Sequence, residues 1–206
     1  MVNHVQQQYD HLAPIYDQRW QFYIQNTLQF LVQWAHIQPH EKVLDLACGT
    51  GEFAMLWHDH CPAHSMLIGV DFSEQMLAIA REKCAGLPNI QFCCAAATQL
   101  PRNLPQFDVV VCANAFHYFE PPLQVLAEIG QVLQPAGRVV ILDWCRDFWL
   151  CRLCDWWLSW RDPAHQRCYT EAELHQLLHQ AGYHIGRSRR VRFGWLWGLM
   201  IVEATH

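Results

Sequence analysis

The sequence predicts an α/β protein built on a doubly wound, Rossmann-like sheet of seven mostly parallel strands. Over residues 43–143, short apolar runs alternate with amphipathic helical stretches, and two adjacent strand-like runs end the chain. Strands that alternate with helices form a parallel sheet with both faces covered. Two strands joined by a short link should instead pair as an antiparallel hairpin. The length fits a single domain, residues 1–206.

An amphipathic helix is predicted ahead of the first strand. Its apolar residues recur three or four positions apart, which places them on one helix face. They are Trp20, Ile24, Leu28, Leu31 and Ala35. We expect about residues 1–38 to form a helical cap on the domain.

Strands and helices then alternate. Five strands are expected at Val43–Ala47, Leu67–Asp71, Ile90–Ala95, Asp108–Ala113 and Val139–Asp143. The helices between them are expected at Glu52–His60, from the N-cap Ser73 to about Cys84, and from Pro122 to near Leu133.

A helix and a hairpin are expected at the C-terminal end. Thr170 followed by Glu173 is a capping box, and Gly182 is suited to end the helix that it starts. The last two strands are expected near His184–Phe193 and Trp195–Ala204, with the link at Gly194. A sheet closed by such a hairpin is unusual for a nucleotide-binding dehydrogenase domain.

The composition excludes several classes of protein. Apolar residues make up 52% of the chain and charged residues 16%, so a large core can be buried. A net charge of −5 argues against a general nucleic-acid binder, which needs a basic surface to neutralise phosphates. No stretch reaches the roughly 18 uncharged apolar residues of a membrane span.

The ten cysteines do not predict disulfides. No secretory signal opens the sequence, and Cys93, Cys94 and Cys112 fall inside apolar strand-like runs. There they behave as small hydrophobic residues in a reducing compartment. We therefore expect a cytoplasmic protein.

The most specific motif is an apolar strand that enters a glycine turn and a helix, from Val43 to Ala54. Gly49 and Gly51 remove side chains where a ligand meets the backbone. The helix N-terminus offers N–H groups and a partial positive charge. The site suits a pyrophosphate or a methionine carboxylate, and Asp45 at the strand end suits an amino group.

Asp71 ends the next strand, 20 residues after Gly51. An acid at this position can accept hydrogen bonds from both ribose hydroxyls. Strand, glycine turn, helix, strand and acid together are far more specific than the glycines alone. The alternative is a tight turn without a ligand and a solvent-facing Asp71.

Six motifs within residues 9–143 carry a family resemblance. They are Tyr9–Asp17, Val43–Gly51, Gly69–Ser73, Leu100–Pro101, Phe107–Val110 and Leu133–Arg138. With them the chain resembles the class I S-adenosylmethionine-dependent methyltransferases, in the ubiquinone/menaquinone methyltransferase-like branch that acts on small molecules. The resemblance implies S-adenosylmethionine as cofactor and S-adenosylhomocysteine as product.

The glycine turn and the resemblance together imply a set of cofactor-binding residues. They are Tyr16, Asp45, Ala47, Gly49, Gly51, Asp71, Phe72, Ala97 and Asn114. Two positions depart from the family pattern. Ala47 stands where the family usually has glycine, and Ala96 where it commonly has an aspartate that bonds the adenine amino group. That hydrogen bond is worth about 0.5–1.5 kcal/mol, so its loss need not abolish binding.

Two other functions stay open. Gly49–Ala54 also fits a dinucleotide fingerprint, which would make the protein an NAD-dependent oxidoreductase. Asp45, the missing second mononucleotide half and the terminal hairpin argue against this function. The departure at Ala96 leaves room for a non-catalytic protein that binds S-adenosylmethionine.

The loop after the fourth strand carries the candidate base. The carboxyl ends of strands form the site in an open parallel sheet, and His117 lies there with a pKa range suited to proton transfer. The alternative is a histidine that only packs or contacts the cofactor. Asp143 ends the fifth strand on the same rim, where it either orients a base or substrate or is solvated.

No metal site is expected. Metal-ligating residue types occur in two groups, and neither supplies a full ligand set with recognised zinc spacing. The groups are His175 with His179, and His58, His60, Cys61 and His64.

A tryptophan-rich helical insert is expected at about residues 144–168. Its apolar stripe is Trp149, Leu153, Trp156 and Trp160. The stripe is core packing, a lid over a flat apolar substrate, or a shallow membrane contact. A remoter option is thiol capture of a metalloid by Cys145, Cys151, Cys154 and Cys168, whose spacing does not match the arsenic methyltransferases.

These features predict methyl transfer to a small, aromatic or apolar acceptor, at oxygen or at carbon. The candidate substrate contacts are Tyr118, Trp149 and Trp156. The expected partner is a small-molecule substrate and no nucleic acid, and the insert leaves a peripheral membrane contact open.

Overall fold

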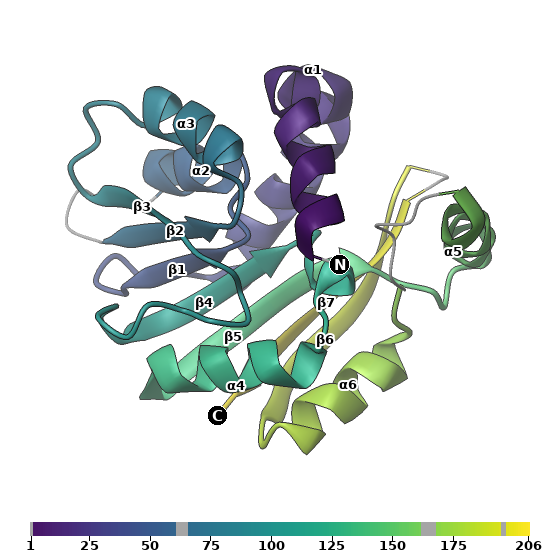
Figure 1. Ribbon diagram of the computed structural model, residues 1–206. Helices are drawn as coiled ribbons and strands as arrows, with labels where there is room; N and C mark the ends of the chain where they lie inside the picture. The colour runs from purple at the N-terminus through teal and green to yellow at the C-terminus, as the bar shows by residue number, and fades with distance from the viewer. Residues whose placement is uncertain (1, 61–65, 162–167, 195–196) are drawn as a thin grey trace.

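A computed structural model describes residues 2–60, 66–161, 168–194 and 197–206. The described residues form a seven-stranded sheet in the order β3-β2-β1-β4-β5-β7-β6 (Figure 1). Its strands are β1 Val43–Leu46, β2 Leu67–Asp71, β3 Ile90–Cys94, β4 Phe107–Ala113, β5 Leu133–Trp144, β6 His184–Phe193 and β7 Trp197–Thr205. The predicted fold class is confirmed.

The strand pairing places the motifs at one crevice. β1 pairs in parallel with β2 on one side and with β4 on the other, and β7 runs antiparallel to both β5 and β6. The strand order therefore reverses between β1 and β4. In open sheets of this kind, ligands bind outside the carboxyl ends of the strands at that switch point.

The helices begin and end close to where their local signals predicted. They are α1 Val2–Ala35, α2 Glu52–His60, α3 Glu74–Lys83, the 3-10 turn η1 Phe116–Tyr118, α4 Pro122–Val132, α5 Trp149–Arg161 and α6 Glu171–Gln180. Ser73 caps α3 by accepting from the Met76 N–H, and both hydrogen bonds of the capping box at Thr170 and Glu173 are present. These contacts join residues three positions apart, so the sequence alone specifies them.

Two elements extend further than predicted. The α1 helix begins at Val2 and contains Pro14, well before the periodic stretch that predicted it. The β5 strand begins at Leu133. Leu133 pairs with Phe107 of β4, and the register between the two strands shifts between Phe107 and Val109. The predicted strand began at Val139, because Pro135 and Gly137 are typical of a loop.

Both faces of the sheet are covered, as Figure 1 shows. Leu28 of α1 and Trp57 of α2 pack with Val43 on one face. Ile129 of α4 packs with Leu44 on the other. Neighbouring residues of a strand point to opposite faces, so an apolar run such as β1 is buried on both sides.

The α5 helix turns part of its apolar stripe outward. Trp149 and Leu153 are 62% and 54% exposed, whereas Cys151 is buried and its thiol donates to the Gly198 carbonyl over 3.2 Å. Core packing is therefore wrong for Trp149 and Leu153. The side chains of Trp156 and Trp160 lie outside the described residues.

Candidate active site

The glycine loop between β1 and α2 takes a backbone path that favours small residues. Ala47, Gly49 and Gly51 have φ values of 60°, 54° and 79°, all in the left-handed region. A Cβ on Gly51 would lie 3.0 Å from the Ala80 Cβ, so this glycine lets the loop pack on α3. At Gly49 a Cβ would meet nothing within 4 Å, and this part of the loop faces open space. Ala47 occupies its position at a cost of about 1–2 kcal/mol relative to glycine.

Asp45 is a buried acid with an unmet hydrogen bond. It is 2% exposed, and its Oδ2 atom has no hydrogen-bond partner among the described residues. Burial, together with the nearby charge of Asp71, raises the pKa of Asp45 to about 8. Such an oxygen is suited to a cationic donor supplied by a ligand. The unpaired Asp45 oxygen therefore fits the amino group of an amino-acid ligand as its acceptor.

Asp71 holds the glycine loop to the end of β2. Its Oδ2 accepts from the Gly49 N–H and its Oδ1 from the Ser73 N–H, each over 2.9 Å. Burial raises its pKa, whereas these backbone hydrogen bonds lower it. A carboxylate oxygen can accept more than one hydrogen bond, so ribose hydroxyls can still bind Asp71. The alternative of a solvent-facing Asp71 is wrong, because the residue is only 6% exposed.

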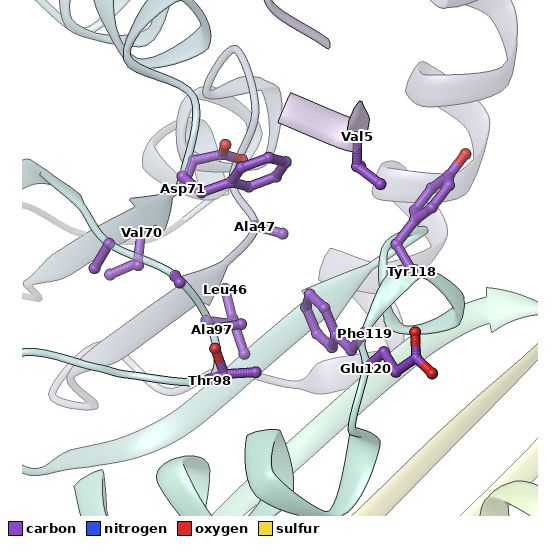
Figure 2. Close-up of a pocket in the computed structure, with 13 residues that line it drawn as sticks. Val5, Leu46, Ala47, Val70, Asp71, Ala97, Thr98, Tyr118, Phe119 and Glu120 are labelled. Carbon is purple, nitrogen blue, oxygen red and sulfur yellow. The ribbon is translucent and has the colours of Figure 1, made fainter. Parts of the chain in front are cut away.

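A cavity of about 220 Å³ opens beside these residues. Figure 2 shows Asp71 on one side of it, Val5 and Tyr118 across from it, and Phe119 below. The predicted residues that it brings together are Ala47, Asp71, Phe72, Ala97 and Tyr118. Its lining is mostly apolar, which suits a nucleobase and other flat ligands.

A smaller cavity of about 60 Å³ adjoins the first. The two share Ala47, Asp71, Phe72 and Tyr118, among others, and the smaller one adds the predicted residues Tyr16, Gly49 and Asn114. Asp45 and Gly51 line neither cavity. Seven of the nine predicted cofactor residues thus gather at one place, although they come from separate parts of the chain.

The wall of the larger cavity after β3 consists of Ala95, Ala96, Ala97 and Thr98. Among these four residues only Thr98 has a polar side chain. The wall therefore offers a methyl group at Ala96, where the resembled family commonly has an aspartate. The Ala96 carbonyl accepts from the Gln99 N–H over 2.9 Å, which fixes the turn.

The first half of α1 covers the crevice. Gln6 donates to the Phe72 carbonyl over 2.9 Å, and Ser73 donates to Asp10 over 2.5 Å. Thr50 donates to Asp17 over 2.6 Å. Val5 therefore lines both cavities and Tyr9 the smaller one, although neither was predicted as a site residue. Tyr9 belongs to the opening motif Tyr9–Asp17, which was the available signal.

Asn114 lies on the rim with its side chain held by α1. Its φ is 56°, and its Oδ1 atom accepts from the Tyr23 hydroxyl over 2.6 Å. The Trp144 indole in turn donates to the Tyr23 oxygen over 2.6 Å. The Asn114 amide also donates to the Thr27 hydroxyl over 3.4 Å, so both polar ends of this side chain contact α1.

His117 and Asp143 form a buried pair. The backbone N–H of His117 donates to Asp143 Oδ2 over 2.8 Å, and the ring Nδ1 lies 2.7 Å from Asp143 Oδ1. His117 and Asp143 are 5% and 1% exposed, so Asp143 is not a solvated acid. The His117 ring lies beneath Tyr118, with ring centroids 4.1 Å apart, and Tyr118 rather than His117 lines the cavities.

The tryptophan-rich insert contributes Trp144 rather than Trp149 to this region. The Trp144 ring stacks near His117, with centroids 6.0 Å apart and planes at 27°. Trp149 lines neither cavity and is largely exposed. The side chain of Trp156, the other predicted tryptophan contact, is not described.

The described residues contain no candidate metal site and no candidate membrane span. Within residues 2–60, 66–161, 168–194 and 197–206, no three His, Cys, Asp or Glu side chains gather where they could hold a metal ion. In the same parts of the chain, no helix combines the length and apolar character needed to cross a membrane.

The switch-point crevice, the left-handed glycine loop, the orphaned Asp45 and the buried Asp71 fit the cofactor site of a class I S-adenosylmethionine-dependent methyltransferase domain. Residues 43–137 match the family described as methyltransferase domain. Among curated proteins, the chain is similar to quinone methyltransferases over part of its length.

The chain is 31% identical over 147 residues to the demethylmenaquinone methyltransferase of Staphylococcus epidermidis, a match that spans 69% of this chain and 58% of that protein. It is 29% identical over 153 residues to the 2-phytyl-1,4-naphtoquinone methyltransferase of Nostoc sp., spanning 71% of this chain and 67% of that protein. The chain thus covers less than two thirds of the Staphylococcus relative.

The fold is shared with solved methyltransferase structures. The methyltransferase solved with the Trm112 methyltransferase activator of Haloferax volcanii aligns with a TM-score of 0.83 at 17% identity, over 96% of each chain. None of these three matches is an oxidoreductase, and the NAD-dependent alternative has no support among them.

Proposed function

We propose that the protein transfers a methyl group from S-adenosylmethionine to a small, planar, largely apolar acceptor, such as a quinol or phenol, at oxygen or at carbon. The observation that carries this proposal is the continuity of the two cavities. One is a mostly apolar pocket beside Asp71, and the other joins the glycine loop to Tyr118. The curated relatives, whose names specify quinone substrates, support an aromatic acceptor.

Several residues would hold the cofactor. The first N–H groups of α2 suit its carboxylate, and Asp45 suits its amino group. Asp71 suits its ribose hydroxyls, and Phe72 with Ala97 borders the space for its adenine. When bound, S-adenosylmethionine supplies a methyl group activated for attack by a nucleophile.

An acceptor hydroxyl must also lose its proton, and His117 is our candidate to receive it. The Asp143 Oδ1 atom, 2.7 Å from the ring Nδ1, would hold the Nδ1–H, and Nε2 would then be the atom that receives the proton. Because Tyr118 separates His117 from the cavities, the proton must pass beside the Tyr118 ring or through its hydroxyl. Tyr118 and Phe119 would then contact the acceptor ring itself.

Two assays test this function. Calorimetry should show binding of S-adenosylmethionine and no binding of NAD, and the reverse result would overturn the proposal. Formation of S-adenosylhomocysteine should then depend on aromatic acceptors in a panel of phenols, quinols, carboxylic acids, amines, thiols and arsenite. Turnover of amines or arsenite alone would exclude the aromatic acceptor. Binding without turnover of any acceptor would indicate a non-catalytic cofactor-binding protein.

The outward stripe of α5 supports a second proposal about the same substrate class. Trp149 and Leu153 are exposed apolar side chains, and Arg152 lies between them in the sequence. Such a face is suited to a shallow contact with the surface of a membrane that holds an apolar acceptor.

Trp156 remains a candidate contact of the acceptor. If its ring covers aromatic acceptors, Trp156→Ala should raise the apparent KM for them.

A further inference from the structure

Three tyrosine rings gather over the glycine loop. Tyr9 and Tyr16 lie seven positions apart on α1, which puts them on the same helix face. The Tyr9 ring centroid is 6.0 Å from that of Tyr16 and 5.7 Å from that of Tyr118, with the second pair edge to face. All three line the smaller cavity together with Gly49 and Asp71.

The place of this cavity identifies the part of the cofactor that it faces. In S-adenosylmethionine the sulfur atom joins the ribose to the amino-acid chain. Asp71 is the ribose residue and Gly49 belongs to the amino-acid loop, and both line the same cavity. The sulfur must therefore lie between them, beside the tyrosine rings. This step rests on the cofactor site proposed above.

The rings offer neutral π faces rather than charges. Burial raises the pKa of Tyr9 well above its ordinary value, and the nearby Tyr118 and Tyr16 raise it further. Burial also raises the pKa of Tyr16, with contributions from Tyr118 and from the charge of Asp71. The phenols thus stay protonated, and an aromatic face attracts a cation that replaces water beside it.

The formal charges around the cavity favour a cation as well. Asp10 and Asp17 of α1 reach the rim at Ser73 and Thr50, and Asp71 lines the cavity itself. Lys83 is the cation beside them, and it is paired with Asp17 at 2.5 Å and with Glu52. Carboxylates therefore outnumber the ammonium group at this end of the site.

We propose that Tyr9, Tyr16 and Tyr118 form an aromatic cage that recognises the cationic sulfonium of S-adenosylmethionine and distinguishes it from the neutral thioether of S-adenosylhomocysteine. The cage gives the protein a preference for the methyl donor over the spent product. Product that has lost its charge also loses this attraction, and its release becomes easier. Tyr9 and Tyr16 are positioning residues, since they act on the cofactor's charge and take no proton.

Calorimetry on the wild-type protein provides the first test. S-Adenosylmethionine should bind roughly tenfold more tightly than S-adenosylhomocysteine, as a desolvated cation–π contact would give. Sinefungin, which carries an ammonium group near the position of the sulfonium, should bind with the tighter class. Equal affinities for the three ligands would overturn the cage while leaving the methyltransferase assignment intact. No binding of any of them would instead overturn the cofactor site.

Matched variants separate the ring from its hydroxyl. Tyr9→Phe and Tyr16→Phe keep an aromatic face and should keep the preference for S-adenosylmethionine. Tyr9→Leu and Tyr16→Leu remove the face and should bring the affinity ratio several-fold closer to one. A leucine variant that folds, as judged by thermal unfolding, and keeps the wild-type ratio would contradict the cage. A loss of the ratio in the phenylalanine variants would contradict it too, because the hydroxyls would then carry the selectivity.

Discussion

The Asp71 carboxylate accepts a hydrogen bond from the Gly49 backbone N–H over 2.9 Å and so ties the end of β2 to the loop that follows β1. The same carboxylate accepts from the Ser73 N–H, at the start of α3. One side chain thus sets the shape of the loop and faces the cavity beside it. Binding of a ligand in that cavity should therefore be coupled to local stability at this residue.

Asp71→Ala should weaken binding of S-adenosylmethionine by roughly 1–3 kcal/mol, the cost of leaving polar groups unpaired in a closed site. It should also lower the melting temperature, because two backbone N–H groups lose their acceptor. Asp71→Asn is the matched control, since it keeps one acceptor oxygen and the side-chain volume, and its effect should be smaller. Calorimetry and thermal unfolding measure the two effects. An unchanged dissociation constant in Asp71→Ala would remove Asp71 from the site.

Asp45 should make the cofactor-free protein less stable as the pH rises. Its ordinary pKa of 3.8 applies to the unfolded chain, whereas burial beside Asp71 raises the folded value to about 8. Between these values the folded state binds a proton that the unfolded state has lost, so stability falls with rising pH until about pH 8. Thermal unfolding from pH 5 to pH 9 should show this slope in the wild type and a smaller one in Asp45→Asn.

Saturating S-adenosylmethionine should reduce that pH dependence, because its amino group favours the charged form of Asp45. Binding should accordingly release protons below about pH 8, and calorimetry in buffers of different ionisation enthalpy detects them. Equal slopes for the wild type and Asp45→Asn would show that Asp45 is already paired in the folded protein.

His117→Ala should lower turnover of a hydroxyl acceptor by roughly 10²–10⁴-fold if His117 receives the proton, with little change in cofactor affinity. Asp143→Asn preserves the shape but weakens control of the His117 tautomer, so it should also lower turnover. His179→Ala, on the exposed end of α6, is the matched control and should leave turnover unchanged. A His117→Ala enzyme with normal turnover would leave the histidine as a packing residue.

Trp149 should contribute little to the stability of the fold, because it is 62% exposed. Trp149→Ala should change the free energy of unfolding by about 0.5 kcal/mol or less. Trp57→Ala, at a fully buried tryptophan of α2, should cost about 3–5 kcal/mol. Urea unfolding measures the stability of both variants.

Sedimentation with lipid vesicles tests the proposed membrane contact of Trp149. Trp149→Ala should bind vesicles more weakly than the wild type. Equal vesicle binding by the wild type and Trp149→Ala would exclude a role for Trp149.

Ala96→Asp should strengthen cofactor binding by about 0.5–1.5 kcal/mol, because it supplies the acceptor that the alanine wall lacks. Ala96 lines the larger cavity, and its substitution leaves the glycine loop unchanged. Calorimetry with S-adenosylmethionine provides the measurement, and Ala85→Asp on the exposed turn after α3 serves as a charge-matched control. An unchanged affinity would mean that the adenine amino group lies away from this wall.

The sequence by itself determined the elements whose signals are local. The apolar run at Val43, the glycines that follow it and the acid at Asp71 specified strand, turn, helix and strand in the order observed. The N-cap at Ser73 and the capping box at Thr170 were equally clear. Such signals can be read from the sequence because each depends on residues within a few positions of one another. The class of the domain followed from the same motifs.

Only the tertiary structure decided which distant residues meet. The spacing of Asp71 to Gly51 predicts a ribose site, yet it could not show that the carboxylate also bonds Gly49. The approach of Tyr9 to Tyr118 depends on how α1 crosses the crevice. The pairing of His117 with Asp143 depends on the neighbouring positions of β4 and β5 in the sheet. The periodicity of Trp149 and Leu153 showed that they share a face but not which way it turns. Helical periodicity fixes relative directions around one axis, and packing against the rest of the chain fixes the rotation of that axis.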